Sequence, residues 1–163
     1  MTDASDETVT AALLVIGDEI LSGRTKDKNI GTIADHCTMI GIRLKEVRVV
    51  GDFEDEIVSA VNELRARYTY VFTTGGIGPT HDDITADSIA KAFGVTIDHH
   101  PEVKALMLEN YARRGVEATP ARLRMARIPH GASLVKNKLS VAPGHGGHPR
   151  RDAGHARFCD AGA

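Results

Sequence analysis

Residues 70–85 constrain the fold of this chain most, because a strand, a glycine loop and a helix start follow one another there. Residues 70–74 (YVFTT) are all β-branched or aromatic, which predicts a buried strand. Three glycines and a proline follow: Gly75, Gly76, Gly78 and Pro79. Backbone N–H groups are free at such a loop, and no Cβ keeps a phosphate away from them. We expect the loop to hold a phosphorylated small molecule; a tight turn that needs glycine for steric reasons alone is the alternative.

The chain around this loop alternates strand and helix patterns. Strands are predicted at residues 8–16, 43–50 and 70–74, and helices at residues 28–40, 54–67 and 85–93. Short connections join them, so the order β-α-β-α-β-α predicts an α/β fold with a parallel sheet and right-handed crossovers. Two further helices are predicted, from Pro101 and over residues 119–126, then a turn at 128–132 and a short strand at 133–135.

We expect one domain over residues 8–144, between a disordered lead-in at 1–7 and an atypical, flexible tail at 145–163. The 163 residues are enough for one hydrophobic core. Residues 144–163 contain no Leu, Ile, Val or Met, so they are expected to add neither a core strand nor a helix face.

Composition argues against several partners. A net charge of −2 and an aromatic content of 4% give no reason to expect nucleic acid. No apolar stretch is long enough to span a bilayer and the N-terminus is acidic, so we expect no membrane partner and a cytoplasmic location. Cys37 and Cys159 form no metal pattern, and Cys37 is expected to be a buried free thiol, which fits a reducing compartment.

Three polar connections follow the predicted strands, at residues 17–24, 51–52 and 75–83. In open parallel sheets, ligands bind beyond the carboxyl ends of the strands. All three connections are therefore expected at one edge of the sheet. Three separate segments at one edge indicate a binding site more strongly than the glycine loop does alone.

Four acidic side chains gather in these connections: Asp18, Asp52, Asp82 and Asp83. Asp82 and Asp83 precede a helix, whose dipole alone would stabilise them. Carboxylates repel a phosphate unless a cation lies between them, and magnesium binds both groups. We therefore expect metal-assisted phosphoryl or nucleotidyl chemistry. Arg24, Lys26 and Lys28 are candidate counter-charges, but we expect at least two of them to be solvated surface residues.

Other catalytic motifs are absent or weak. The glycine loop is not a Walker A loop, because no Gly-Lys-[Ser/Thr] follows, and it lacks the GxGxxG spacing of dinucleotide sites. The histidines of the tail, with Cys159, match no common zinc module. The chain has no nucleophile elbow and no supported Ser/His/Asp arrangement.

Residues 74–85 (TGGIGPTHDDIT) resemble the TGG-x-GPT-x-DD-x-T signature of the molybdopterin-binding domain family, the MoaB/Mog type. The chain is most similar to the CinA-like branch (competence/damage-inducible protein A, N-terminal domain). Other stretches that match in order are residues 16–23 (IGDEILSG), 27–29 (DKN), 50–52 (VGD), 129–132 (PHGA), Asn137 and 142–144 (APG).

This resemblance implies a three-layer α/β/α sandwich of MoaB/Mog type that forms a homo-oligomer, a trimer or a dimer. It implies that Asp52 and Asp83 are catalytic and hold a divalent metal, magnesium or else cobalt or manganese. The positions expected to bind ligand or phosphate are Gly17, Asp18, Glu19, Thr74, Gly75, Gly76, Gly78, Pro79, Thr80, Asp82 and Thr85.

The resemblance implies two kinds of activity. CinA-like members are associated with metal-dependent hydrolysis of the ADP-ribose pyrophosphate bond, and pterin-processing members with adenylylation of molybdopterin. We expect binding of a phosphorylated pterin or nucleotide, molybdopterin included, and metal-dependent pyrophosphate hydrolysis of an ADP-ribose-like substrate. The alternatives are a non-catalytic molybdopterin- or nucleotide-binding module, or a truncated inactive member, because residues 145–163 show neither the family's next strand nor its LPG-x-P-type loop.

Overall fold

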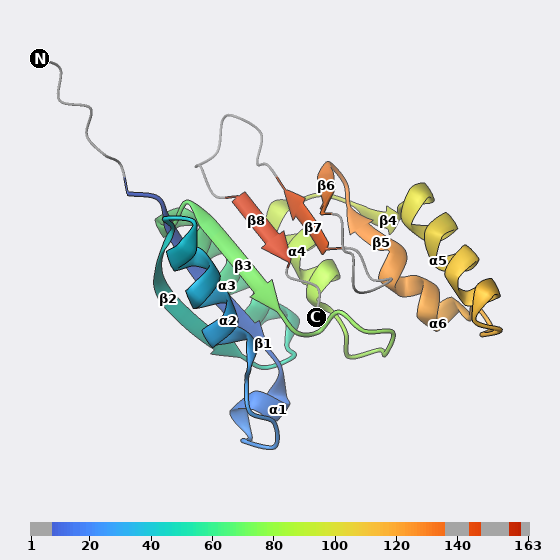
Figure 1. The fold of residues 1–163 in the computed structure, drawn as a ribbon, viewed down its shortest axis with the longest axis horizontal. Coiled ribbons are helices and arrows are strands. Elements are labelled where there is room, and N and C mark those ends of the chain that lie inside the picture. The colour runs from blue at the N-terminus through green and yellow to red at the C-terminus, as the bar shows by residue number, and fades with distance from the viewer. Residues whose placement is uncertain (1–7, 136–143, 148–156, 161–163) are drawn as a thin grey trace, which may run out of the picture.

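A computed structural model describes residues 8–135, 144–147 and 157–160 of the chain. Within these residues the main sheet has the strand order β2-β1-β3-β8-β7-β6, and β4 and β5 form a separate two-stranded sheet (Figure 1). The strands are β1 (Thr10–Ile16), β2 (Arg43–Val50), β3 (Tyr70–Thr74), β4 (Ile97–His99), β5 (Arg127–Pro129), β6 (Ala132–Val135), β7 (Gly144–Gly147) and β8 (Arg157–Asp160).

The first half of the main sheet is parallel. Strand β1 pairs in parallel with β2 and β3, and β3 pairs in parallel with β8. Strand β7 pairs antiparallel with both β8 and β6. The predicted α/β fold with a parallel sheet and flanking helices is therefore confirmed, and the antiparallel half is an addition that the sequence pattern did not predict.

Helices lie on both faces of this sheet. They are α1 (Asp18–Leu21), α2 (Asn29–Met39), α3 (Glu54–Arg67), α4 (Thr85–Phe93), α5 (Pro101–Arg113), α6 (Pro120–Leu123) and the 3-10 turn η1 (Arg124–Ala126). The chain crosses from β1 to β2 in one direction and from β2 past β1 to β3 in the other. Because both crossovers are right-handed, α2 and α3 lie on opposite faces (Figure 1).

The main core lies between β1 and the pair α3 and α4. Ala12, Leu14 and Ile16 point to this side of β1, because alternate residues of a strand face the same way. They pack with Ile57 and Ile89, and with further buried residues of α3 and α4. The residues of β1 that face α2 are buried as well, so β1 reads as the continuous apolar run typical of a central parallel strand.

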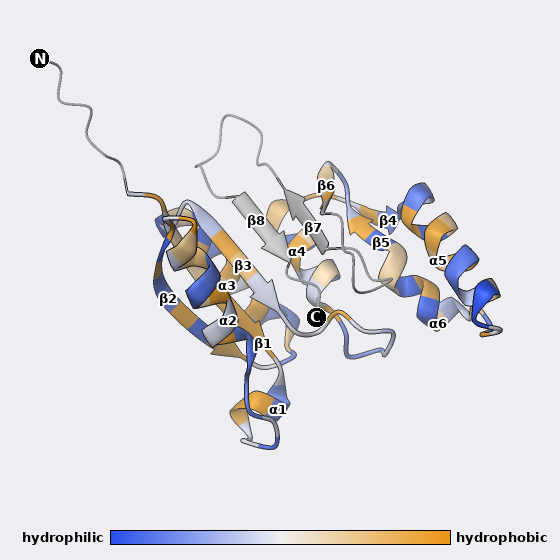
Figure 2. Ribbon diagram, viewed as in Figure 1, coloured by the Kyte–Doolittle hydropathy of each residue, from blue (hydrophilic) through white to orange (hydrophobic). Residues whose placement is uncertain are grey.

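A second, smaller core lies under α5. One side of α5 carries Val103, Met107 and Tyr111 at intervals of four residues. These side chains pack with Ala126 and Ile128. Figure 2 shows the resulting alternation of hydrophobic and hydrophilic bands along α5. This cluster anchors the β4–β5 sheet, and an ion pair between Arg127 of β5 and Asp87 of α4 joins it to the main unit, with one pair of atoms 2.6 Å apart.

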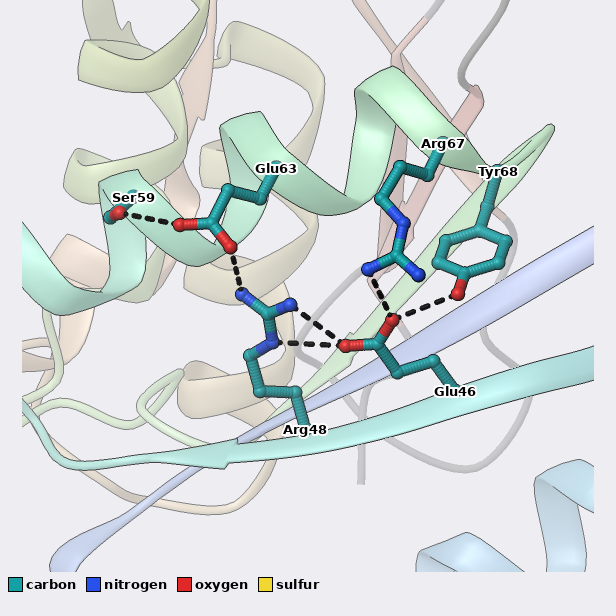
Figure 3. Close-up of polar contacts among 6 residues, drawn as sticks. All are labelled: Glu46, Arg48, Ser59, Glu63, Arg67 and Tyr68. Atoms are coloured by element: carbon teal, nitrogen blue, oxygen red, sulfur yellow. Dashed lines mark hydrogen bonds and ion pairs between the residues drawn. The ribbon is translucent and has the colours of Figure 1, made fainter.

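A polar network joins β2 to α3 on the outside of the fold (Figure 3). Glu46 accepts hydrogen bonds from Arg48, at 2.8 Å, from Arg67, at 3.0 Å, and from the Tyr68 hydroxyl, at 2.8 Å. Arg48 also pairs with Glu63 of α3 at 2.7 Å. Edge strand β2 is therefore tied to the helix that covers it.

Several local predictions are wrong. Residues 144–147 and 157–160 form β7 and β8, so the segment expected to add no core strand supplies two strands of the main sheet. A β-ladder is made by backbone groups, so the absence of aliphatic residues did not exclude it. Residues 128–132, predicted as a turn, include parts of β5 and β6, and residues 97–99, to which no element was assigned from the sequence, form β4. The connection after β1 contains the short helix α1.

Some predictions lie outside the described residues. These are the lead-in at residues 1–7 and the family-like positions Asn137, Ala142 and Pro143. Among the described residues, no helix has both the length and the apolar character that crossing a bilayer requires.

Candidate functional site

The first two polar connections meet at the carboxyl edge of the parallel strands. The Gly17 N–H donates to the Val50 carbonyl at 3.0 Å, and the Asp18 N–H donates to Oδ2 of Asp52, also at 3.0 Å. The loop after β1 is thus bonded to the loop after β2. This confirms that these segments, distant in sequence, lie side by side.

The third connection, the glycine loop, is held by the first residue of α4. Thr85 is fully buried, its hydroxyl donates to the Gly75 carbonyl at 2.8 Å, and its N–H donates to the Gly76 carbonyl at 3.2 Å. Gly75 has φ +93°, and a Cβ there would lie 1.9 Å from the Ile16 carbonyl oxygen. Only glycine can therefore occupy this position, and the loop sits against the end of β1.

The loop backbone passes close to both predicted catalytic aspartates. A Cβ on Gly76 would lie 3.6 Å from Oδ1 of Asp52, and a Cβ on Gly78 would lie 2.7 Å from Oδ2 of Asp83. Asp83 also accepts hydrogen bonds from the Thr80 N–H, at 2.8 Å, and from the Thr80 hydroxyl. Asp83 therefore shapes the loop in addition to any role towards a ligand.

Burial and nearby charge act on Asp52. Burial raises the pKa of its carboxyl above the usual range, and the negative charges of Glu19, Asp18 and Asp82 raise it further, while the hydrogen bond from the Asp18 N–H lowers it. Three neighbouring acidic groups thus act on the Asp52 carboxyl at this edge. Such a concentration of negative charge is relieved by a bound cation.

The described residues hold no group of three or more His, Cys, Asp or Glu side chains arranged to bind a metal ion. Magnesium does not require one, because it is commonly held by one or two carboxylates together with substrate phosphates and water. Oδ2 of Asp52 accepts a hydrogen bond from the Asp18 N–H. Oδ1 accepts no hydrogen bond from the described part of the chain. A hard divalent cation shared with a phosphate is therefore compatible with Asp52 and Asp83.

A pocket of about 360 Å³ opens beside the glycine loop. Its lining residues are Val15, Ile16, Glu19, Ile20, Thr25, Lys26, Asp27, Lys28, Asn29, Thr74 and Gly75. Three of the predicted ligand positions therefore face one cavity, between the ends of β1 and β3 and the start of α2. Helix α2 begins at Asn29, one residue later than predicted, and Oδ1 of Asp27 accepts a hydrogen bond from the Ile30 N–H at 2.7 Å.

The other predicted positions lie in different settings. Pro79, Thr80 and Asp82 are exposed at the tip of the loop. Lys28 and Asn29 also line the pocket; Lys28 was a candidate counter-charge for a phosphate, whereas Asn29 was not predicted to contact a ligand. The DKN stretch that contains them resembled the family's helix start, and that similarity was the available signal.

Fold and site together define the class of this protein: a parallel α/β domain whose strand ends carry a tight glycine loop flanked by carboxylates. The chain belongs to the molybdopterin-binding domain family, since a family model described as "Probable molybdopterin binding domain" matches residues 12–151. The α/β fold predicted from this resemblance is confirmed.

Two curated relatives show the similarity in sequence. A protein of Saccharolobus islandicus (strain L.S.2.15) is 40% identical over 135 residues, which cover 82% of this chain and 51% of that protein. A protein of Metallosphaera sedula is 37% identical over 136 residues, with 83% and 51% covered. The chain spans about half the length of these curated relatives.

Solved structures show the same fold. The structure described as the protein CinA with unknown function, from Thermoplasma acidophilum, has a TM-score of 0.80 and 30% identity, covering 93% of this chain and 86% of that one. MoaB from Pyrococcus furiosus, described as a tungsten cofactor synthesizing protein, has a TM-score of 0.60 and 18% identity, with 94% and 81% covered. The similarity to the Pyrococcus furiosus protein, at 18% identity, concerns the fold alone.

Proposed function

We propose that this domain binds a phosphorylated nucleotide or pterin and hydrolyses the pyrophosphate bond of an ADP-ribose-like substrate with the help of a divalent metal. One observation carries the proposal: the glycine loop runs directly past Asp52 and Asp83, so a phosphate on the loop lies next to both carboxylates. Family membership supports the binding of a phosphate-bearing ligand. The hydrolysis step is proposed in addition.

The loop supplies the phosphate contacts in this proposal. The backbone N–H groups of Gly76 and Gly78 donate to no acceptor within the described residues. Both are therefore free to donate to phosphate oxygens. Thr85 fixes the loop by holding the Gly75 and Gly76 carbonyls. The loop is therefore rigid at the point where the ligand binds, which lowers the entropic cost of binding.

Asp52 and Asp83 would hold the metal. A divalent cation there neutralises phosphate charge and lowers the pKa of a bound water. Hydrolysis joins the water oxygen to one phosphorus and breaks that phosphorus's bond to the bridging oxygen, which leaves on the other phosphate. The water protons pass to solvent. ADP-ribose plus water thus gives AMP and ribose 5-phosphate, and no covalent bond to the protein forms.

A thermal-shift panel followed by a hydrolysis assay tests the proposal. The panel contains ADP-ribose, nucleotides and pterin phosphates, each with and without magnesium, manganese or cobalt. We expect ADP-ribose with metal to raise the melting temperature and to be converted to AMP and ribose 5-phosphate. No shift with any ligand would contradict both binding and hydrolysis.

A second candidate is a binding module without catalysis. It is favoured by the two hydrogen bonds that Asp83 accepts from Thr80, which give this carboxylate a structural role without a metal. Its distinguishing result is a melting-temperature increase with molybdopterin or a nucleotide, and no product with any of the three metals.

The molecule is further proposed to act as a cytoplasmic homo-oligomer. Met39 and Ile40 at the end of α2 are 81% and 55% exposed, and Val47 on edge strand β2 is 39% exposed. Val47 pairs with Leu13 and so points to the face of the sheet that carries α2. Light scattering after size exclusion should show a dimer or trimer that Met39→Glu weakens; a monomer at micromolar concentration would contradict assembly.

A further inference from the structure

Two adjacent threonines at the end of β3 are buried without hydrogen-bond partners. Thr73 is 0% exposed and Thr74 is 3% exposed, and among the described residues neither hydroxyl finds a partner. A buried polar group without a partner destabilises a fold, so each needs an explanation. Their neighbours in the sheet show on which side of the sheet each hydroxyl lies.

Thr73 and Thr74 face opposite sides of the sheet. Thr73 lies opposite Leu14, which belongs to the core under α3 and α4. Thr74 lies opposite Val15, on the face that carries α2, and both Thr74 and Val15 line the 360 Å³ pocket. The Thr73 hydroxyl is therefore on the core side, whereas the Thr74 hydroxyl is on the side of a cavity that can admit a ligand.

The pocket lining suits a sugar better than a ring system. Seven of its eleven residues carry polar or charged side chains: Glu19, Thr25, Lys26, Asp27, Lys28, Asn29 and Thr74. None of the lining residues is aromatic, so a nucleobase or pterin would find no stacking partner there. Hydroxyl, amide and carboxylate groups instead match the hydroxyl groups of a ribose.

Two lysines line the pocket together with two carboxylates, and the pocket adjoins the glycine loop. Lys26 and Lys28 lie just before α2, whose N-terminus favours an anion. Gly75 of the glycine loop lines the pocket, and so does Glu19, whose neighbour Asp18 donates its N–H to Asp52. A ligand that occupies the pocket can therefore reach the glycine loop and Asp52 with its phosphates.

We propose that this pocket binds the ribose 5-phosphate end of the substrate. The Thr74 hydroxyl and the Glu19 carboxylate hydrogen-bond the ribose hydroxyls, and Lys26 and Lys28 lie beside its phosphate. The inference rests on the proposed function, because it assigns one end of the pyrophosphate substrate. It makes the terminal sugar, and not a heterocycle, the group that this cavity recognises.

Titration calorimetry on two matched variants tests the assignment, with ribose 5-phosphate and AMP as separate ligands in magnesium. Thr74→Val keeps the shape of the side chain and removes the hydroxyl on the pocket side; Thr73→Val does the same on the core side. We expect Thr74→Val to weaken ribose 5-phosphate binding about tenfold, as for one lost hydrogen bond, and to leave AMP binding unchanged. Thr73→Val should leave both unchanged.

Neither variant should unfold, because each replaces an unpartnered hydroxyl by a methyl group, and melting temperatures check this. Hydrolysis of ADP-ribose by the wild type is measured in parallel. If hydrolysis occurs but Thr74→Val and Thr73→Val bind ribose 5-phosphate alike, or if Thr74→Val weakens both ligands equally, the sugar assignment is wrong and the proposed function stands. If the wild type neither binds nor hydrolyses, both fail.

Discussion

At the scale of single residues, the glycine loop is determined by close contacts. Gly75 combines a left-handed backbone with a Cβ position that the Ile16 carbonyl oxygen already occupies. Gly76 and Gly78 leave room for Thr85, Asp52 and Asp83 in the same way. The loop therefore depends on glycine for its shape as well as for any phosphate it binds.

Gly75→Ala should lower the free energy of unfolding by about 3 kcal/mol, because it adds a steric clash to an unfavourable φ. Gly115→Ala is the matched control, since Gly115 has φ +62° and nothing within 4 Å of its Cβ position. That variant should cost about 1 kcal/mol. Urea denaturation measures both, and equal losses would show that the packing of Gly75 is looser than the structure indicates.

Asp83→Asn should reduce ADP-ribose hydrolysis at least about 100-fold, because it removes a charged metal ligand. The amide oxygen can still accept from the Thr80 N–H, so the loop turn should persist and the melting temperature should stay near that of the wild type. Asp55→Asn, at an exposed position of α3, serves as the control. Unchanged turnover in Asp83→Asn would remove the catalytic role.

At the scale of elements, ion pairs add polar links between elements at the surface of the fold. The Asp87–Arg127 pair links α4, which begins at the glycine loop, to the β4–β5 sheet. The Glu46 network links edge strand β2 to α3 (Figure 3). The Glu46–Arg48 and Asp87–Arg127 pairs are only partly exposed, which reduces their screening by salt, whereas Glu63 and Arg67 are exposed.

The Glu46 network should make stability depend on pH. Hydrogen bonds from Arg48 and Tyr68 hold the pKa of Glu46 below its usual range. The stabilisation is therefore complete above the unfolded-state pKa of about 4.3 and is lost as the pH falls through the lower, folded-state pKa. Glu46→Gln should cost about 1 kcal/mol at pH 7, and progressively less as the pH falls below about 4.

Urea denaturation at several pH values between 7 and 3 measures this effect. Glu109→Gln is the control, since its pair with Arg113 is exposed and 4.0 Å long. A difference between wild type and Glu46→Gln that stays constant over this range would show that the charge of Glu46 contributes nothing to stability.

At the scale of the whole molecule, β8 connects the two halves of the main sheet. It lies between β3, which it meets in parallel, and β7, which it meets antiparallel. Without β8, strand β3 would become a sheet edge next to the glycine loop, and exposed edges promote aggregation. The segment with the least hydrophobic sequence thus occupies a central place in the sheet.

Cys159→Pro should lower the free energy of unfolding by at least about 2 kcal/mol, because proline cannot donate to the ladder of a central strand. Cys159 lies opposite both Phe72 and Gly146, so its backbone is within the paired region. Cys159→Ala keeps the backbone N–H and is the control. Equal stability of the two variants, measured by urea denaturation, would show that β8 does not hold the sheet together.

Local pattern was enough to predict β1, β2, β3 and the four longest helices, because their apolar spacing reflects which side of each element is buried. The same pattern, with the glycine loop, predicted that three loops share one edge of the sheet, since parallel strands end together. The roles given to Asp52 and Asp83 remain predictions.

Tertiary structure alone decided the rest. Strands β4, β7 and β8 are held by backbone pairing with distant residues, which leaves no periodic signal in so few residues. The pocket that joins Thr74 to Asn29 exists because a crossover places the start of α2 over the end of β3. Local sequence carries the spacing of apolar residues, but only long-range pairing determines which distant backbone and side-chain groups meet.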